Sequence, residues 1–168
     1  MTFASDDPIQ TTEWDSPLGR LLLTRQGHDL LGVWFSDQAN IPTWASDAPR
    51  VPADGVLAEA VRQLGRYFAG RQTSFDLPLR LHGGTPFQRS VWRALLAIPY
   101  GQTTSYAAVA QSIGRPGAMR ATGSAIGRNP LGIVIPCHRV VGRQGALTGY
   151  TGGLARKRAL LALEARHA

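Results

Sequence analysis

Cysteine and lysine are almost absent from this sequence of 168 residues, which contains one of each, Cys137 and Lys157. One thiol cannot form an internal disulfide, and it supplies too few ligands for a cysteine-based zinc site. The histidines are scattered without the spacing of metal ligands: His28, His82, His138 and His167. We therefore expect no disulfide, no bound metal and no cofactor.

Long hydrophobic runs are absent as well. No apolar stretch approaches the roughly 20 residues that are needed to span a bilayer. The N-terminal segment lacks the basic and apolar regions of a secretory signal peptide. Both absences predict a cytoplasmic protein that makes no membrane contact, and in that reducing compartment the thiol of Cys137 stays reduced.

Acidic residues are in the minority: 11 Asp and Glu face 18 Lys and Arg, which gives a formal net charge of +7 and a pI near 10.7. A surplus of this kind favours a polyanionic partner such as nucleic acid. Because 17 of the 18 basic residues are Arg, a coding bias is an alternative explanation of the same surplus.

Two strands and a helix are expected in the first half of the chain. The apolar runs within residues 16–35 flank a turn at residues 26–29, as in a β-hairpin. The segment 56–70 has helical periodicity and ends at Gly70. The predicted inner face of this helix consists of Leu57, Val61, Leu64 and Phe68. Together these elements predict an α/β lobe.

A lobe boundary is expected at the motif HGGT, residues 82–85, which follows an extended segment at residues 73–81. The motif is polar and contains two glycines, a composition typical of a flexible connection. The predicted organisation is an N-terminal α/β lobe at residues 1–82 and a C-terminal lobe at residues 83–168.

The second lobe opens with strong helix signals. Thr85 is a suitable N-cap, Pro86 occupies the first helical position and Gln88 completes a capping box. Two shorter helices are expected at residues 105–114 and 118–127, joined by a tight turn with the sequence RPG. Two short helices around such a turn are typical of a helix-turn-helix, so this lobe is predicted to be mainly α-helical and to bind DNA.

Extended structure and a last helix are expected after the helix-turn-helix. Ile133–Ile135 is predicted to form a buried strand, and residues 140–147 a hairpin or wing. The inner stripe of the last helix includes Leu160 and Leu161, and Glu164 falls on the same stripe. A carboxylate that points inward needs a partner.

Cys137 is the candidate nucleophile. Pro136 restricts the backbone before it, and the imidazole of His138 is a group that can turn the thiol into a thiolate. Glu164 can orient that imidazole, which gives a Cys–His–Glu arrangement. Because adjacent residues do not face each other on a strand or helix, a water molecule is the natural proton relay between Cys137 and His138. Spacing alone leaves open a hydrolase, a transferase, or a plain buried cysteine.

The segment from about Gly84 to Glu164 closely resembles the O6-alkylguanine-DNA alkyltransferase family, also called methylated-DNA–protein-cysteine methyltransferases. The resemblance runs through these stretches in order: GTPFQRSVWRALLAIPYGQTTSYAAVA, GAMRATGSAIGRNP, IPCHRVVG and LTGYTGG. The N-terminal lobe is similar to the family only in its general pattern of strands and a helix. The resemblance implies a ribonuclease-H-like α/β lobe followed by a mainly α lobe, with a winged-helix-like helix-turn-helix and an active-site cysteine.

The resemblance also implies a reaction. Cys137 takes the alkyl group from O6 of guanine in an SN2-like displacement, and His138 and Glu164 support the thiolate through water. Asn129 holds the active-site turn by hydrogen bonding, and Tyr106 donates to guanine N3 so that the base leaves neutral. Because the base must leave the stack before it can react, the partner is double-stranded DNA that carries O6-alkylguanine, with O4-alkylthymine as a further candidate. The thioether is not hydrolysed, so each molecule acts once.

Further residues receive roles from the resemblance alone. Arg120 fills the space that the flipped guanine leaves, with the helix lying in the minor groove. The other residues assigned to DNA contact are Ala118, Ala121, Thr122, Gly123 and Arg128. The residues assigned to the substrate pocket, besides Tyr106, are Val140, Tyr150, Thr151 and Lys157. No obligate protein partner is implied.

The chain departs from many relatives at Ile126, Gly127 and Arg128, where those relatives carry Asn-Gly or a basic residue, so the resemblance does not predict its DNA contacts and pocket shape near Ile126. It also lacks the N-terminal zinc ligands of some relatives and the cysteine-rich domain of the adaptive-response members. Three alternatives remain: a catalytically silent alkyltransferase-like protein that only binds damage, a helix-turn-helix repressor, and a cysteine hydrolase. The first normally replaces the reactive cysteine, which is present here.

Overall fold

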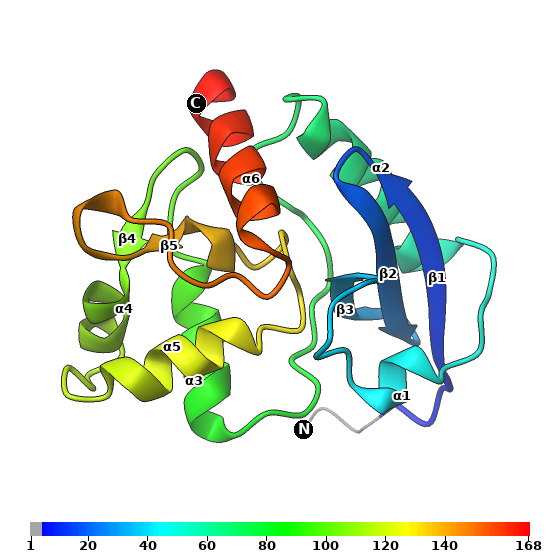
Figure 1. The fold of residues 1–168 in the computed structure, drawn as a ribbon. Helices are drawn as coiled ribbons and strands as arrows, with labels where there is room; N and C mark the ends of the chain where they lie inside the picture. Colours follow the sequence, from blue (N-terminus) through cyan, green and yellow to red (C-terminus); the bar gives the residue numbers. More distant parts are fainter. Residues whose placement is uncertain (1–4) are drawn as a thin grey trace. The chain divides into compact units, whose positions relative to one another are not determined.

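The computed structural model describes residues 5–168, which divide into two compact units (Figure 1). One unit ends at His82 and the other begins at Gly83. Each unit buries its own apolar residues, and each is considered by itself. Among the residues described, every helix is too short or too polar to cross a lipid bilayer.

A three-stranded antiparallel sheet forms the centre of the first unit. Its strands are β1 (Ile9–Ser16), β2 (Gly19–Gln26) and β3 (Asp29–Phe35), in that order. The predicted β2–β3 hairpin is confirmed, whereas β1 was not predicted. The sequence of β1, IQTTEWDS, hides the strand because two of its inward residues are threonines. The hydroxyl of Thr11 donates to the carbonyl of Leu23 at 2.8 Å, which makes burial of this polar side chain tolerable.

Helices α1 (Thr43–Ser46) and α2 (Gly55–Phe68) complete the first unit. The predicted helix is confirmed as α2, but its inner face is rotated from the predicted one, since Val61 and Phe68 are only half-buried. The residues that α2 buries are Leu57, Ala60, Gln63, Leu64 and Tyr67. Gln63 is buried because its amide bonds both the N–H and the carbonyl of Asp76, each at 2.9 Å, and so fixes the extended segment that follows.

The second unit begins with three helices, α3 (Pro86–Leu95), α4 (Tyr106–Ser112) and α5 (Met119–Gly127). The predicted capping box is confirmed: the Thr85 hydroxyl accepts from the N–H of Gln88 at 3.1 Å, and the Gln88 side chain accepts from the N–H of Thr85 at 2.9 Å. The two helices of the predicted helix-turn-helix are confirmed as α4 and α5. The indole of Trp92 on α3 donates to the carbonyl of Ala125 on α5 at 2.8 Å, which ties the pair to the core.

The rest of the second unit has little regular extended structure. Strands β4 (Thr104–Ser105) and β5 (Val140–Val141) form a two-residue parallel pair, and the 3-10 turns η1 (Cys137–Arg139) and η2 (Arg143–Gly145) flank β5. The predicted hairpin at residues 140–147 is therefore wrong. The N–H of Gly142 donates to the carbonyl of Ala146 at 2.8 Å, which closes a short loop instead of a strand pair. The last helix, α6 (Leu154–His167), is confirmed.

Candidate active site

Cys137 begins η1 and is 8% exposed, at the end of a turn that a single side chain holds together. Asn129 accepts from the N–H of Leu131 at 3.0 Å and donates from Nδ2 to the carbonyl of Ile135 at 2.9 Å. The strand predicted at Ile133–Ile135 is wrong. Ile133 has a left-handed φ of 69°, and the N–H of Ile135 donates back to the carbonyl of Leu131 at 2.8 Å. These three residues are buried, but as a tight turn that delivers the thiol.

His138 and Glu164 form a buried pair, as the inward direction of Glu164 predicted. Imidazole Nε2 lies 3.0 Å from Oε1 of Glu164, and the two side chains are 0% and 1% exposed. An ionised carboxylate only accepts hydrogen bonds, so Nε2 carries the proton and Nδ1 of the neutral ring is the acceptor. Within residues 5–168, Nδ1 is buried without a hydrogen-bond partner. The pair therefore presents a free base atom.

Arg139 is a member of this cluster that the sequence analysis missed. Its Nε lies 3.1 and 3.0 Å from the two carboxylate oxygens of Glu164, and its Nη2 lies 2.6 Å from Oε1. Its Nη1 donates to the carbonyl of Ile98 at 2.7 Å, and the guanidinium stands 5.6 Å from the ring centroid of Tyr100. The sequence did place Arg139 next to His138, which was a clue to its role. Hydrophobic periodicity, however, does not show that this arginine is buried.

The electrostatics of the cluster favour a thiol and a neutral imidazole at rest. Burial raises the pKa of the Cys137 thiol, and the side chain of Asn129 and the charge of Lys157 act in the opposite direction. Burial likewise lowers the pKa of His138, although Glu164 raises it. Burial also opposes ionisation of Glu164, but hydrogen bonds from His138 and Arg139 outweigh it and hold the pKa of this carboxyl at about 2.

Lys157, on α6, is a buried cation with only carbonyl acceptors. Its Nζ donates to the carbonyl of Val140 at 2.6 Å and to that of Thr148 at 2.8 Å. Burial lowers the pKa of Lys157, and the neighbouring Cys137 raises it. The ammonium group thus supports a thiolate at Cys137, and it fixes the chain on both sides of the loop between β5 and α6.

The remaining residues assigned to a substrate pocket lie around this loop. Tyr106, at the start of α4, is half-buried, and its hydroxyl lies 3.3 Å from the Thr148 hydroxyl. The exposed Thr151 donates to the carbonyl of Gly127 at 2.6 Å, which ties the loop to α5. Tyr150 is half-buried, and burial raises its pKa well above the usual value, so that its hydroxyl remains protonated.

Helix α5 presents most of the residues assigned to DNA contact. Arg120, Ala121 and Arg128 are exposed. Ala118 and Gly123 are half-exposed, and a Cβ at Gly123 would lie 3.6 Å from the ring of Tyr106. An alanine at 123 would therefore make an ordinary van der Waals contact with that tyrosine.

Two residues of α5 face the interior. Thr122 is 0% exposed: the helix turns this side chain into the core, which argues against a side-chain contact with DNA. Ile126 is 6% exposed and packs inside, whereas the following Gly127 and Arg128 are exposed.

Thr122→Val should raise the unfolding free energy by about 1 kcal/mol, because within residues 5–168 the threonine hydroxyl is buried without a hydrogen-bond partner. Valine has nearly the same shape and lacks the polar atom. Chemical denaturation measures the effect, with Ser124→Ala on the exposed side of α5 as the control. Weaker duplex binding with unchanged stability would instead return Thr122 to the DNA contact set.

Charge is distributed very unevenly in this unit. Residues 83–168 contain ten arginines and one lysine but a single acidic side chain, Glu164. Glu164 is buried, so the exposed arginines of the unit have no acidic side chain of the unit to pair with. Such a surface attracts phosphate groups strongly.

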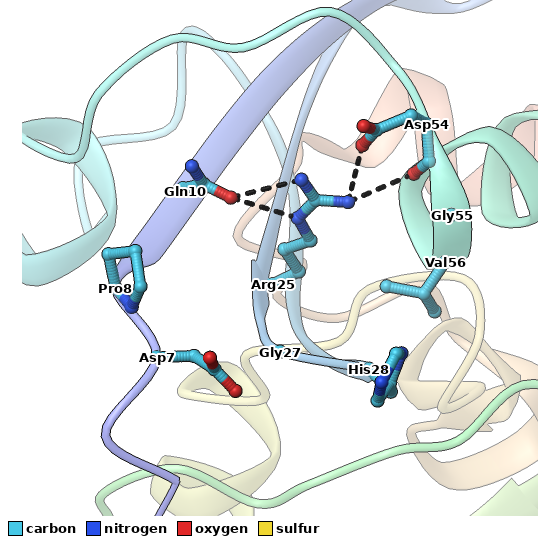
Figure 2. Close-up of a pocket in the computed structure, with 9 residues that line it drawn as sticks. All are labelled: Asp7, Pro8, Gln10, Arg25, Gly27, His28, Asp54, Gly55 and Val56. Carbon is cyan, nitrogen blue, oxygen red and sulfur yellow. Dashed lines mark hydrogen bonds and ion pairs between the residues drawn. The ribbon is translucent and has the colours of Figure 1, made fainter.

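The first unit contains a hollow of about 300 Å³ (Figure 2). The guanidinium of Arg25 contacts Gln10 Oε1 at 3.0 and 3.2 Å and the Asp54 carboxylate at 2.5 Å. Asp7 and His28 line the opposite side. Arg25 is paired with Asp54, and the lining residues include neither a thiol nor a hydroxyl, so the hollow does not compete with Cys137 as a reactive centre.

Comparison with known proteins connects both units to one kind of protein. Residues 86–166 match the family model described as 6-O-methylguanine DNA methyltransferase, DNA binding domain. Residues 10–81 match the model described as 6-O-methylguanine DNA methyltransferase, ribonuclease-like domain. The two matches leave only the ends of the chain and a short connection uncovered.

Individual relatives agree with the family models. A methylated-DNA--protein-cysteine methyltransferase of Mycolicibacterium paratuberculosis is 53% identical, over 91% of this chain and 90% of the relative. The constitutive enzyme of that name from Bacillus subtilis is 43% identical, over 89% and 91%. The crystal structure of Mycobacterium tuberculosis OGT in complex with DNA superimposes with a TM-score of 0.87 and 47% identity, covering 95% of this chain and 94% of that one.

Proposed function

The chain belongs to the 6-O-methylguanine DNA methyltransferase family, and from that premise we propose that it repairs DNA by moving an alkyl group from O6 of guanine to its own Cys137. The observation that carries the assignment of the acceptor is the position of the only thiol of the chain. It sits on a turn held by Asn129, beside the His138–Glu164 pair.

The chain's residues divide the chemistry between them. The Cys137 sulfur attacks the alkyl carbon, the carbon–sulfur bond forms, and the carbon–O6 bond breaks. The thiol proton passes through a water molecule to Nδ1 of His138, whose other nitrogen is held by Glu164. Tyr106 donates to guanine N3 as the carbon–O6 bond breaks, so that the base leaves neutral, and the proton taken from the thiol balances the one that guanine gains. Because the product is a stable thioether, the protein is consumed in a single turnover.

The test is incubation with an oligonucleotide duplex that carries O6-methylguanine, followed by mass spectrometry of the peptide that contains Cys137. We expect one methyl group on that peptide and unmodified guanine in the DNA. Binding without methyl transfer would indicate the catalytically silent alternative, which the names of the relatives do not support. Hydrolysis of a small ester without any effect of DNA would indicate a cysteine hydrolase.

The partner is double-stranded DNA, bound through the second unit. The exposed side of α5 carries Arg120 between the small residues Ala118 and Ala121, which permits close approach of the helix to a groove. Arg120 enters the duplex where the guanine has been flipped out, and Arg128 contacts phosphate.

A pocket in the second unit receives the flipped base. The residues that line or support it are Val140, Tyr150, Thr151 and Lys157. The proposed protein is cytoplasmic and has two lobes. A smaller lobe at residues 1–82 is followed by the DNA-binding and transferase lobe at residues 83–168.

Arg120→Ala should slow repair of duplex DNA by about 10-fold or more, while its reaction with free O6-benzylguanine stays within about 2-fold of wild type. The free base needs no flipping, so it needs no residue to fill the gap that flipping leaves in the stack. Single-turnover rates on both substrates provide the comparison. Arg115→Ala, an exposed arginine between α4 and α5, is the matched control. Equal losses on the two substrates would exclude the intercalating role.

A further inference from the structure

Glu164 is shared between two donors. Its Oε1 lies 3.0 Å from His138 Nε2 and 2.6 Å from Arg139 Nη2, and its Oε2 lies 3.0 Å from Arg139 Nε. Because residues 83–168 contain no other acidic side chain, this carboxylate is the only counter-charge that the unit offers to either partner. His138 and Arg139 are adjacent in the chain, so one 3-10 turn places both on the same carboxylate.

The charge state of His138 depends on how that carboxylate is balanced. A buried carboxylate that faced His138 alone would draw a proton onto the imidazole, because an unpaired buried charge is costly. The imidazolium has no acceptor left at Nδ1, so it could not take a proton from the thiol. The bidentate contact with Arg139 supplies the missing positive charge without protonating the ring.

We propose that Arg139 is a positioning residue for alkyl transfer: it balances and orients Glu164, so that His138 remains neutral and keeps Nδ1 available for the proton of Cys137. This inference deepens the proposed function, since it presumes that His138 receives that proton. Arg139 itself is held by the carbonyl of Ile98 at 2.7 Å and by the ring of Tyr100, which fixes its fork against the carboxylate.

Of the other ionisable groups around the cluster, Lys157 acts on His138 in the same sense as Arg139. Lys157 and Glu164 come from α6, Cys137 comes from η1, and Tyr100 lies in the segment between α3 and β4. Burial lowers the pKa of His138 most strongly, Glu164 raises it, and the charges of Arg139 and then Lys157 lower it again. Arg139 is the only one of these cations in direct contact with the carboxylate that opposes them.

Arg139→Gln should raise the pKa of the His138 ring by about 1–3 units. Without the guanidinium, the negative charge of Glu164 acts on the ring unopposed, and a nearby opposite charge typically shifts a pKa by that amount. NMR titration of ¹⁵N-histidine-labelled protein measures the pKa and also shows which ring nitrogen carries the proton. Arg139→Lys keeps a cation beside Glu164 and should keep the His138 pKa near its wild-type position. Arg166→Gln, an exposed arginine on α6, controls for loss of positive charge in general.

An unshifted His138 pKa in folded Arg139→Gln protein would overturn the proposal and leave Arg139 as a packing residue. If that variant does not fold, the double variant Glu164→Gln/Arg139→Gln is titrated in its place, because neither buried charge is then left without its partner. If the guanidinium balances the carboxylate, removing both should leave the His138 pKa close to its wild-type value, and a large shift would equally overturn the proposal. Neither titration uses alkylated DNA, so a failure of the proposed function would be seen separately.

Discussion

Cys137→Ser is expected to reduce alkyl transfer to the background level while duplex binding remains within about 2-fold of wild type. A serine hydroxyl is a far weaker nucleophile than a thiolate, and His138 and Lys157 cannot make up the difference. The substitution is nearly isosteric, so the turn held by Asn129 should persist. Because the chain has no second thiol, no other residue can take over as the acceptor.

Stoichiometry provides the decisive measurement for this prediction. Wild-type protein mixed with an excess of O6-methylguanine duplex should repair DNA until one methyl group is bound per protein molecule, and then stop. Gel-shift binding to the same duplex controls for folding of Cys137→Ser. Continued repair beyond one equivalent would contradict a single-turnover transfer, and retained transfer by Cys137→Ser would remove Cys137 as the acceptor.

Glu164→Ala should have the largest effect on stability, a loss of about 3–5 kcal/mol, which is the usual cost of leaving one partner of a buried ion pair without the other. The carboxylate is 1% exposed, and its removal strands the buried guanidinium of Arg139 and the N–H of His138. For a chain of this length the loss corresponds to a fall in melting temperature of roughly 6–20 °C. Asp15→Ala, which breaks the exposed pair with Arg20, should leave the melting temperature nearly unchanged.

The same carboxyl should make stability dependent on pH in a defined direction. Hydrogen bonds from His138 and Arg139 overcome the opposing effect of burial and hold the Glu164 pKa at about 2, below its usual value of 4.5. A depressed folded-state pKa stabilises the protein above the unfolded-state pKa, and the stabilisation is lost as pH falls toward the folded-state pKa. Wild-type melting temperature should therefore decline between about pH 4.5 and pH 2 more steeply than that of Glu164→Gln. Parallel curves would show that Glu164 is not ionised in the folded protein.

Local signals in the sequence were enough for the elements whose causes are local. Thr85 and Gln88 predicted the start of α3, because a capping box involves only residues three positions apart. The turn at residues 26–29 predicted the β2–β3 hairpin for the same reason. The inward direction of Glu164 followed from helical periodicity, and the neighbouring His138 made it a reasonable partner.

Features that depend on distant partners were decided by the tertiary structure. Strand β1 was missed because its buried threonines are acceptable only beside β2. Ile133–Ile135 is as apolar as a buried strand, but its backbone groups find partners nearby without a second strand. Asn129 donates to the carbonyl of Ile135, and the N–H groups of Val134 and Ile135 donate to carbonyls within the same turn. In both cases the hydrogen-bond partners decide the backbone conformation, and the hydrophobic pattern does not show those partners.

The sequence by itself determined that the only thiol lies beside an imidazole, in motifs that resemble one family of DNA repair proteins, on a chain with a helix-turn-helix. Only the tertiary structure decided that Thr122 faces inward and that Arg139 shares Glu164 with His138. Glu164 is 25 and 26 residues from these two partners, and no local periodicity relates positions that far apart. The three residues come into contact because α6 packs against η1. This packing places the carboxylate of Glu164 between the N–H of His138 and the guanidinium of Arg139, in a unit that has no other acidic side chain.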